Sequence, residues 1–145
     1  METEGTVPYE WVRHSLASMH ARASALEQEW SRRRSVREFS QESVPRSLIE
    51  LAIRAASSAP SGAHRQPWRF VAISDPKIKQ RIRIAAEQEE YESYEGGRMP
   101  ESWRAALAPL GTTWEKPYLE TVPWIVVVFE EIYRLDHAGN LEKNY

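Results

Sequence analysis

The sequence contains no cysteine among its 145 residues. This absence excludes disulfide bonds, a catalytic thiolate, iron–sulfur clusters and cysteine-bound zinc. No stretch approaches the roughly 20 apolar residues that a membrane-spanning helix needs. The N-terminus is acidic and polar, without the basic region and apolar core of a signal peptide. We therefore expect a soluble, cytoplasmic protein.

The sequence also lacks an excess of charge of either sign. The 19 Lys and Arg residues nearly balance the 21 Asp and Glu residues, which leaves a formal net charge of -2. This balance gives no general attraction to nucleic acid or to an anionic membrane, so neither is expected as a partner. The histidines show no metal-ligand spacing, and we expect no metal site. They are His14, His20, His64 and His137.

A long helix without Gly or Pro is predicted from Trp11 to Arg34. Its apolar residues recur every three or four positions and form one stripe, which favours packing against a partner surface. The stripe suits the core of the same chain, and it also suits a helix that wraps a second subunit. It consists of Val12, Leu16, Met19, Ala23, Leu26 and Trp30.

The rest of the chain predicts an α+β pattern. Helices are expected at 45–58, 76–94 and 101–110, a further turn at 114–119, strands at 68–74 and 122–129, and a loop-like tail at 136–143. The strand at 122–129 is apolar on both faces and needs neighbours on both sides. Because two strands are too few for a stable sheet, further strands are expected from later in the chain or from another chain.

A dense basic cluster could bind phosphate, since planar guanidinium groups make bidentate hydrogen bonds to it. The cluster reads Arg32-Arg33-Arg34-Ser35-Val36-Arg37. By itself this pattern is more typical of a solvated helix end, where arginine favours the helix dipole. A second candidate is the loop Pro60-Ser61-Gly62-Ala63-His64, whose backbone N–H groups could approach a flat ligand or an anion. Alternatively, it is an ordinary connection between a helix and a strand.

A third candidate combines Glu90, Tyr94 and Lys116. Glu90 and Tyr94 are four residues apart and share one face of a helix. With Lys116 they could bind a zwitterion, because the carboxylate suits an α-ammonium group and the ammonium suits an α-carboxylate. The alternative is that the acidic run at 87–92 is a solvated helix face.

These segments resemble, in order and nearly in spacing, the FMN-binding segments of the nitroreductase superfamily. The Ser-Gly-Ala-His form of the loop is similar to the iodotyrosine deiodinase branch, and Glu90, Tyr94 and the segment 114–120 resemble its substrate lid. The likeness extends from about Arg32 to Phe129. The lid is one residue longer than the family pattern, which leaves Glu89 as the alternative to Glu90.

The resemblance implies a nitroreductase-like, three-layer α+β fold that is incomplete at its C-terminus. Residues 1–31 are then a lead-in and a dimer-wrapping helix, and residues 32–145 are a partial FMN-binding domain. The residues implied to bind FMN are Arg33, Arg34, Ser35, Arg37, Pro60, Ser61, Gly62 and Ala63. Those implied to bind the substrate are Ala63, through its backbone N–H, with Glu90, Tyr94 and Lys116.

The reaction implied by the resemblance is the reductive dehalogenation of halotyrosines such as mono- and diiodotyrosine. The electrons come from NAD(P)H, and the flavin carries out the redox chemistry, so no catalytic side chain is expected. Such proteins are homodimers with FMN at the interface. Two alternatives remain open: a general nitroreductase or quinone reductase, and a non-catalytic truncated fragment that binds no flavin.

Overall fold

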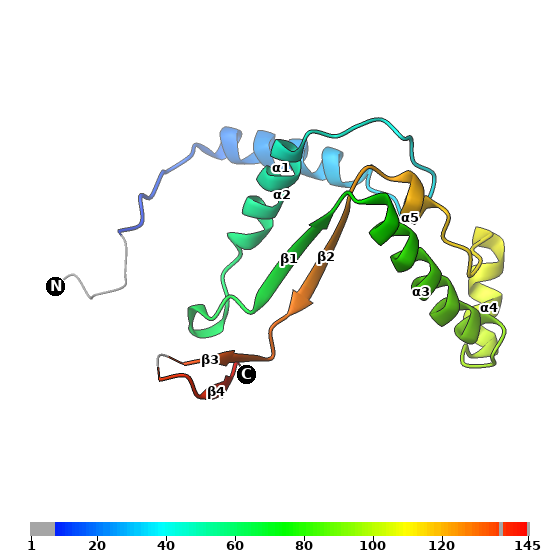
Figure 1. Cartoon of the computed structure of the whole chain (residues 1–145). Coiled ribbons are helices and arrows are strands. Elements are labelled where there is room, and N and C mark those ends of the chain that lie inside the picture. Colours follow the sequence, from blue (N-terminus) through cyan, green and yellow to red (C-terminus); the bar gives the residue numbers. More distant parts are fainter. Residues whose placement is uncertain (1–7, 137, 145) are drawn as a thin grey trace. The chain divides into compact units, whose positions relative to one another are not determined.

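The computed structural model describes residues 8–136 and 138–144 (Figure 1). The chain forms two compact units, of which the first extends to Val36 and the second begins at Arg37. Among the described residues, no helix is both long and apolar enough to cross a membrane. The elements are α1 (Leu16–Trp30), α2 (Arg46–Ser57), η1 (Gly62–His64), β1 (Trp68–Ile73), α3 (Pro76–Tyr94), α4 (Glu101–Leu107), η2 (Ala108–Leu110), α5 (Tyr118–Thr121), β2 (Ile125–Glu130), β3 (Tyr133–Leu135) and β4 (Leu141–Lys143).

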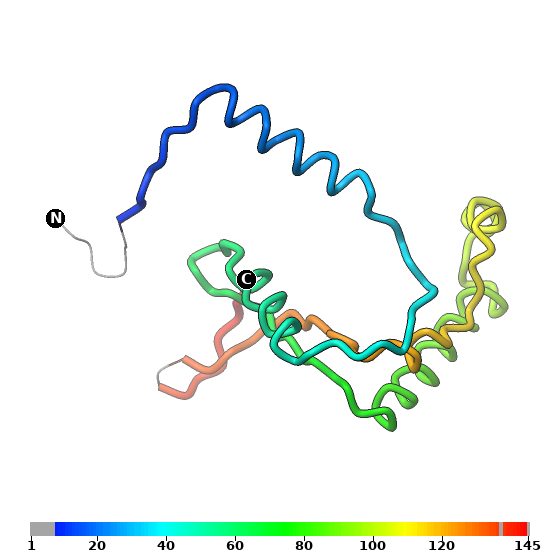
Figure 2. Tube along the Cα trace, turned by 90° about the horizontal axis from the view of Figure 1, so that it is seen from above, coloured from blue at the N-terminus to red at the C-terminus, as the bar shows by residue number. Residues whose placement is uncertain are grey.

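The first unit contains α1, which is shorter than the helix predicted from Trp11 to Arg34 (blue in Figure 2). The helix begins after Ser15, whose extended backbone and side-chain oxygen form an N-cap that accepts the Ser18 N–H at 3.2 Å. Its apolar stripe is exposed. The periodic pattern in the sequence therefore extends beyond both ends of the helix. The Ser15 N-cap sets the first residue of the helix.

The helices of the second unit begin close to the predicted positions. In α3 the Asp75 carboxylate accepts the N–H groups of Lys77 and Ile78 at 2.8 and 3.1 Å, and Pro76 occupies the first turn. Pro45 is the N-cap of α2 rather than its first residue. The turn predicted at 114–119 is instead the short helix α5, which begins after Pro117.

Strands β1 and β2 pair antiparallel, with Trp68 opposite Glu130 and Ile73 opposite Ile125. They form a two-stranded ribbon, and no other strand of the described residues pairs with it (Figure 1). Both faces of β2 are apolar, and Val128 remains 57% exposed. No hydrophobic side chain of the described residues is fully buried. The ribbon therefore has two free edges and incompletely covered faces, as predicted for the strand at 122–129.

Two contacts hold the extended segment that leads into α2 to the rest of the second unit. The Trp124 indole N–H donates to the Val44 carbonyl oxygen at 2.8 Å, and the rings of Phe39 and Tyr118 are 5.8 Å apart. One contact joins this segment to α5, through Tyr118, and the other joins it to Trp124, which lies between α5 and β2. This segment therefore follows a defined path without secondary structure of its own.

The prediction of a loop-like tail at 136–143 is wrong, because β3 and β4 form an antiparallel hairpin. Its turn is closed by Asp136, whose carboxylate accepts the N–H groups of Ala138 and Asn140, each at 2.8 Å. Hydrogen bonds from Asn140 are the main reason that the pKa of Asp136 is lowered. The strands are three residues long, too short for a periodic signal in the sequence. His137 lies outside the described residues.

Candidate functional site

A stripe of polar side chains runs along one face of α3 and contacts the segment at residues 116–122. Its members are Lys79, Arg83, Glu87, Glu90 and Tyr94. They are separated by four, four, three and four residues, the spacing of neighbours on one helical face. The first three form hydrogen bonds to α5 and to residues on either side of it, and the last two lie beside Lys116.

The structure brings together the three side chains predicted to bind a zwitterion. The Lys116 ammonium group lies 3.2 Å from the Glu90 carboxylate and 5.8 Å from the centre of the Tyr94 ring. It also donates to the Thr113 carbonyl oxygen at 2.6 Å, and the Tyr94 hydroxyl donates to Thr112 at 3.1 Å. Only 15% of the Lys116 side chain is exposed, so its pair with Glu90 is partly shielded from water.

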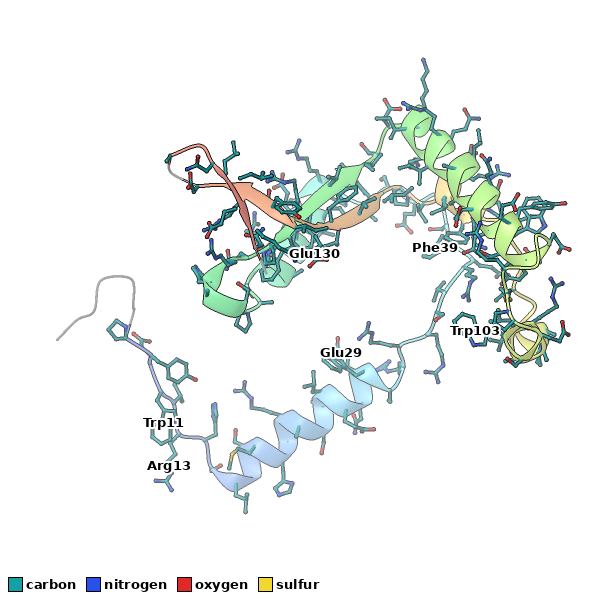
Figure 3. The ribbon with its side chains drawn as sticks, turned by 90° about the horizontal axis from the view of Figure 1, so that it is seen from below. Trp11, Arg13, Glu29, Phe39, Trp103 and Glu130 are labelled. Carbon is teal, nitrogen blue, oxygen red and sulfur yellow. The ribbon has the colours of Figure 1, made fainter. Side chains whose placement is uncertain are left out.

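The alternative assignment to Glu89 is not favoured by this geometry. Glu89 pairs with Arg98, which follows α3, and its side chain is exposed. Glu90 instead lies beside Lys116 and lines a cavity of about 680 Å³. The cavity is also lined by Tyr94, Met99 and Trp103, and Trp103 belongs to α4 (Figure 3). Glu90, whose carboxylate pairs with Lys116, therefore borders a largely apolar space that can receive an aromatic ring.

Glu87 belongs to the same stripe, although a solvated helix face was the alternative interpretation of the run at 87–92. Its Oε1 atom accepts the Arg83 guanidinium N–H at 2.8 Å and the Lys116 backbone N–H at 2.7 Å. These two bonds, the Arg83 bond first, lower the pKa of Glu87. The signal in the sequence was the four-residue spacing of Lys79, Arg83 and Glu87, continued by Glu90 and Tyr94.

The lowered pKa of Glu87 predicts a stabilising contribution that disappears in acid. A carboxyl group whose pKa is lower in the folded state stabilises that state above its unfolded pKa, about 4.3 for Glu. The contribution is lost as the pH falls through the lower folded value. The melting temperature of the unmodified protein should therefore exceed that of Glu87→Gln at neutral pH, with a gap that closes below about pH 4. A gap that stays constant from neutral to acid pH would contradict this origin.

The loop from Pro60 to Gln66 has an unusual backbone conformation. Three residues other than glycine have positive φ: Ala63 at 48°, His64 at 53° and Gln66 at 45°. Such conformations are unfavourable and persist where surrounding structure enforces them. Here the Ser61 hydroxyl oxygen accepts the Gln66 N–H at 2.8 Å. Among the described residues, the N–H groups of Gly62 and Ala63 have no acceptor, so both remain available to a ligand.

A bidentate ion pair anchors this loop to the C-terminal hairpin. The two terminal guanidinium nitrogens of Arg65 donate to the two Glu142 oxygens at 2.8 and 2.7 Å. The Arg65 bond is the main cause of the lowered pKa of Glu142. Sequence reasoning missed this pair, since the partners are 77 residues apart and no local pattern connects them.

The basic cluster is divided between the two units. Arg33, Arg34 and Ser35 belong to the first unit, whereas Arg37 begins the second. Arg34 donates to the carbonyl oxygens of Ser31 and Arg33 at 2.8 and 2.7 Å, and Arg33 lies 5.8 Å from the centre of the Trp30 ring. Neither these arginines nor Arg37 pairs with a carboxylate of a described residue. Their charges are therefore available to an anion.

Known proteins resemble both the sequence and the fold. An iodotyrosine deiodinase from Haliscomenobacter hydrossis is 46% identical over 139 residues, which cover 96% of this chain and 62% of that protein. One from Danio rerio is 40% identical over 139 residues, which cover 96% of this chain and 47% of that protein. A crystal structure of an oxidized iodotyrosine deiodinase with FMN and 3-iodo-L-tyrosine matches with a TM-score of 0.69 and 34% identity, covering 74% of this chain and 57% of that one.

The chain thus spans about half to three fifths of the length of these relatives. The similarity extends over nearly all of the chain, including the loop, α3 and the segment that carries Lys116. The α+β fold class predicted from the sequence is confirmed by the structural match. Residues 31–144 match the Nitroreductase family, and the chain belongs to that family.

Proposed function

We propose that this protein is an FMN-dependent oxidoreductase that reductively dehalogenates halotyrosines such as mono- and diiodotyrosine. The observation that carries the proposal is the assembly of Glu90, Tyr94 and Lys116, of which Glu90 and Tyr94 line a largely apolar cavity. Similarity to iodotyrosine deiodinases at up to 46% identity supports the same substrate class. A nitroarene or a quinone has no zwitterionic group that this charged pair could bind.

The two charges of the amino-acid group match the two charges of the site. Glu90 binds the α-ammonium group, and Lys116 binds the α-carboxylate. Without ligand, these side chains neutralise each other at 3.2 Å. A zwitterion inserts one charge opposite each of them, which keeps both paired, whereas an uncharged phenol supplies no charge to either. The halogenated ring then occupies the apolar space that Met99 and Trp103 line.

The residues of the chain fit the chemistry of FMN. Arg33, Arg34 and Arg37, with Ser35, provide guanidinium and hydroxyl donors for its phosphate group, and these arginines have no carboxylate partner among the described residues. The loop Pro60-Ser61-Gly62-Ala63 would line the flavin, and the Ala63 N–H, which has no acceptor among the described residues, would donate to the substrate phenolate. When bound, FMN would supply two electrons that, together with a proton, replace a carbon–halogen bond by a carbon–hydrogen bond and release the halogen as halide, with NAD(P)H as the source of the electrons.

The proposed active form is a homodimer. The apolar stripe of α1 and the uncovered β1–β2 ribbon are exposed in the single chain, and burial of such surfaces favours association. A second subunit that covers them would also shield FMN bound at the interface from water. The division into a dimer-wrapping segment at 1–31 and an FMN-binding domain from residue 32 is part of this proposal.

A general nitroreductase or quinone reductase is the second candidate function. The apolar lining of the cavity favours it, because such a lining also accepts a neutral aromatic ring. Relative affinities distinguish the two functions: a deiodinase should bind 3-iodo-L-tyrosine far better than 2-iodophenol, and a general nitroreductase should bind them alike. A purified protein without visible flavin absorbance would instead support the non-catalytic alternative, which binds no flavin.

Replacement of Arg34 by alanine tests the phosphate site. In the full-length protein, Arg34→Ala should weaken FMN binding about tenfold, the usual order for one lost charge-assisted hydrogen bond. Flavin that remains after dialysis, measured by visible absorbance, gives the comparison, and circular dichroism checks the fold. Arg13→Ala is the matched control, since Arg13 is exposed and lies outside the cluster. Full FMN retention in Arg33→Ala, Arg34→Ala and Arg37→Ala alike would rule out this assignment.

A further inference from the structure

Glu87 accepts a hydrogen bond from the backbone of Lys116, whereas the ion pair of the Lys116 side chain is with Glu90. It precedes Glu90 by three residues on the same face of α3. Its Oε1 atom accepts the Lys116 N–H at 2.7 Å, and only 13% of its side chain is exposed. One turn of helix thus provides two carboxylates with different tasks, since Glu87 anchors the main chain of Lys116 and Glu90 faces its ammonium group.

Arg83 allows Glu87 to act in this way without competing for the lysine charge. Its guanidinium donates to the same Glu87 oxygen at 2.8 Å and neutralises the carboxylate. The Lys116 ammonium group therefore pairs with Glu90, at 3.2 Å, and not with Glu87. An anchor that carried an unpaired negative charge would draw the ammonium group away from the substrate cavity.

The chain is also fixed on the other side of Lys116, where α5 begins two residues later. Arg83 donates to the Glu120 carboxylate at 3.1 Å. The buried Lys79 ammonium group donates to the carbonyl oxygens of Glu120 and Val122 at 3.1 and 2.6 Å. Because α5 is bound to α3 independently of Glu87, loss of the Glu87 bond should release Lys116 without detaching α5.

We infer that Glu87 is a positioning residue that holds Lys116 where its ammonium group can meet the carboxylate of an amino-acid substrate. The inference rests on the proposed function for Lys116 and Glu90. A lysine side chain has four flexible carbons, so its charge is well placed only if its backbone is fixed. When that hydrogen bond is removed, Lys116 must be ordered by substrate binding itself. The entropic cost of this ordering weakens binding.

The first test follows the anchor itself and requires neither flavin nor substrate. In the full-length protein, Glu87→Ala should accelerate hydrogen exchange of the segment 114–118 about tenfold, because the Lys116 N–H loses its acceptor. Glu87→Gln retains an oxygen that can accept this bond, and it should restore part of the protection. The matched control is Glu92→Ala, which removes the same charge from an exposed position of the same helix. Equal exchange in Glu87→Ala and Glu92→Ala would overturn the inference.

The second test measures equilibrium affinity in the FMN-loaded protein. Glu87→Ala should weaken 3-iodo-L-tyrosine binding roughly tenfold and leave 2-iodophenol binding within about twofold, since only the former uses Lys116. Equal weakening of both ligands would reveal a general structural role and overturn the inference, as would unchanged affinity for 3-iodo-L-tyrosine. If the unmodified protein fails to bind 3-iodo-L-tyrosine, the proposed function fails. The exchange experiment then still decides whether Glu87 anchors Lys116.

Discussion

Lys116→Gln should weaken binding of 3-iodo-L-tyrosine about a hundredfold, the order expected when one partner of a shielded charge pair is removed. The substrate carboxylate would lose its counter-charge, and Glu90 would lose the ammonium group that lies 3.2 Å away in the free protein. Binding of 2-iodophenol should change by less than about twofold, because that ligand has no carboxylate. Isothermal titration of the FMN-loaded, full-length protein with both ligands measures the difference.

Lys77→Gln provides the control, since it removes the same charge from an exposed position at the start of α3. Its affinity for either ligand should equal that of the unmodified protein. A loss of affinity for 2-iodophenol in Lys116→Gln that matches the loss for 3-iodo-L-tyrosine would count against zwitterion recognition. Equal affinities for the two ligands before any substitution would favour the general nitroreductase.

Residues 1–145, expressed alone, should self-associate and retain far less than one FMN per chain. The reason is the β1–β2 ribbon, whose outer edges have no partner strand among the described residues and whose Val128 is 57% exposed. Unpaired strand edges and exposed apolar faces promote association with other chains. Mass by light scattering, together with the ratio of flavin to protein absorbance, tests both parts of the prediction.

A lysine substitution on the exposed strand tests whether association depends on this strand rather than on exposed apolar side chains in general. Val128→Lys should shift the chain toward monomer, because a charge on the strand opposes strand-to-strand association. Ile84→Lys is the control, since Ile84 is similarly exposed, at 59%, but lies on α3. A monodisperse, yellow dimer with one FMN per chain would show instead that these residues complete their own fold on dimerisation.

The sequence by itself determined the features that depend on neighbours along the chain. The Asp75-Pro76 start of α3, the strand at Trp68 and the apolar run of β2 were all predictable, since caps and periodic patterns act within a few residues. The association of Glu90 with Tyr94 followed from helical spacing. Lys116 was added as a candidate because its charge suits a carboxylate, and the structure places it beside both.

Only the tertiary structure decided the contacts between distant segments. It revealed Glu87 as the acceptor for the Lys116 N–H, 29 residues away, and Glu142 as the partner of Arg65, 77 residues away. It also changed the tail from a loop to a hairpin and began α1 at Leu16. An acidic run has the same local sequence pattern whether its carboxylates are solvated or hydrogen-bonded to other parts of the protein. Its role is therefore set by the backbone N–H or guanidinium that packing brings to it.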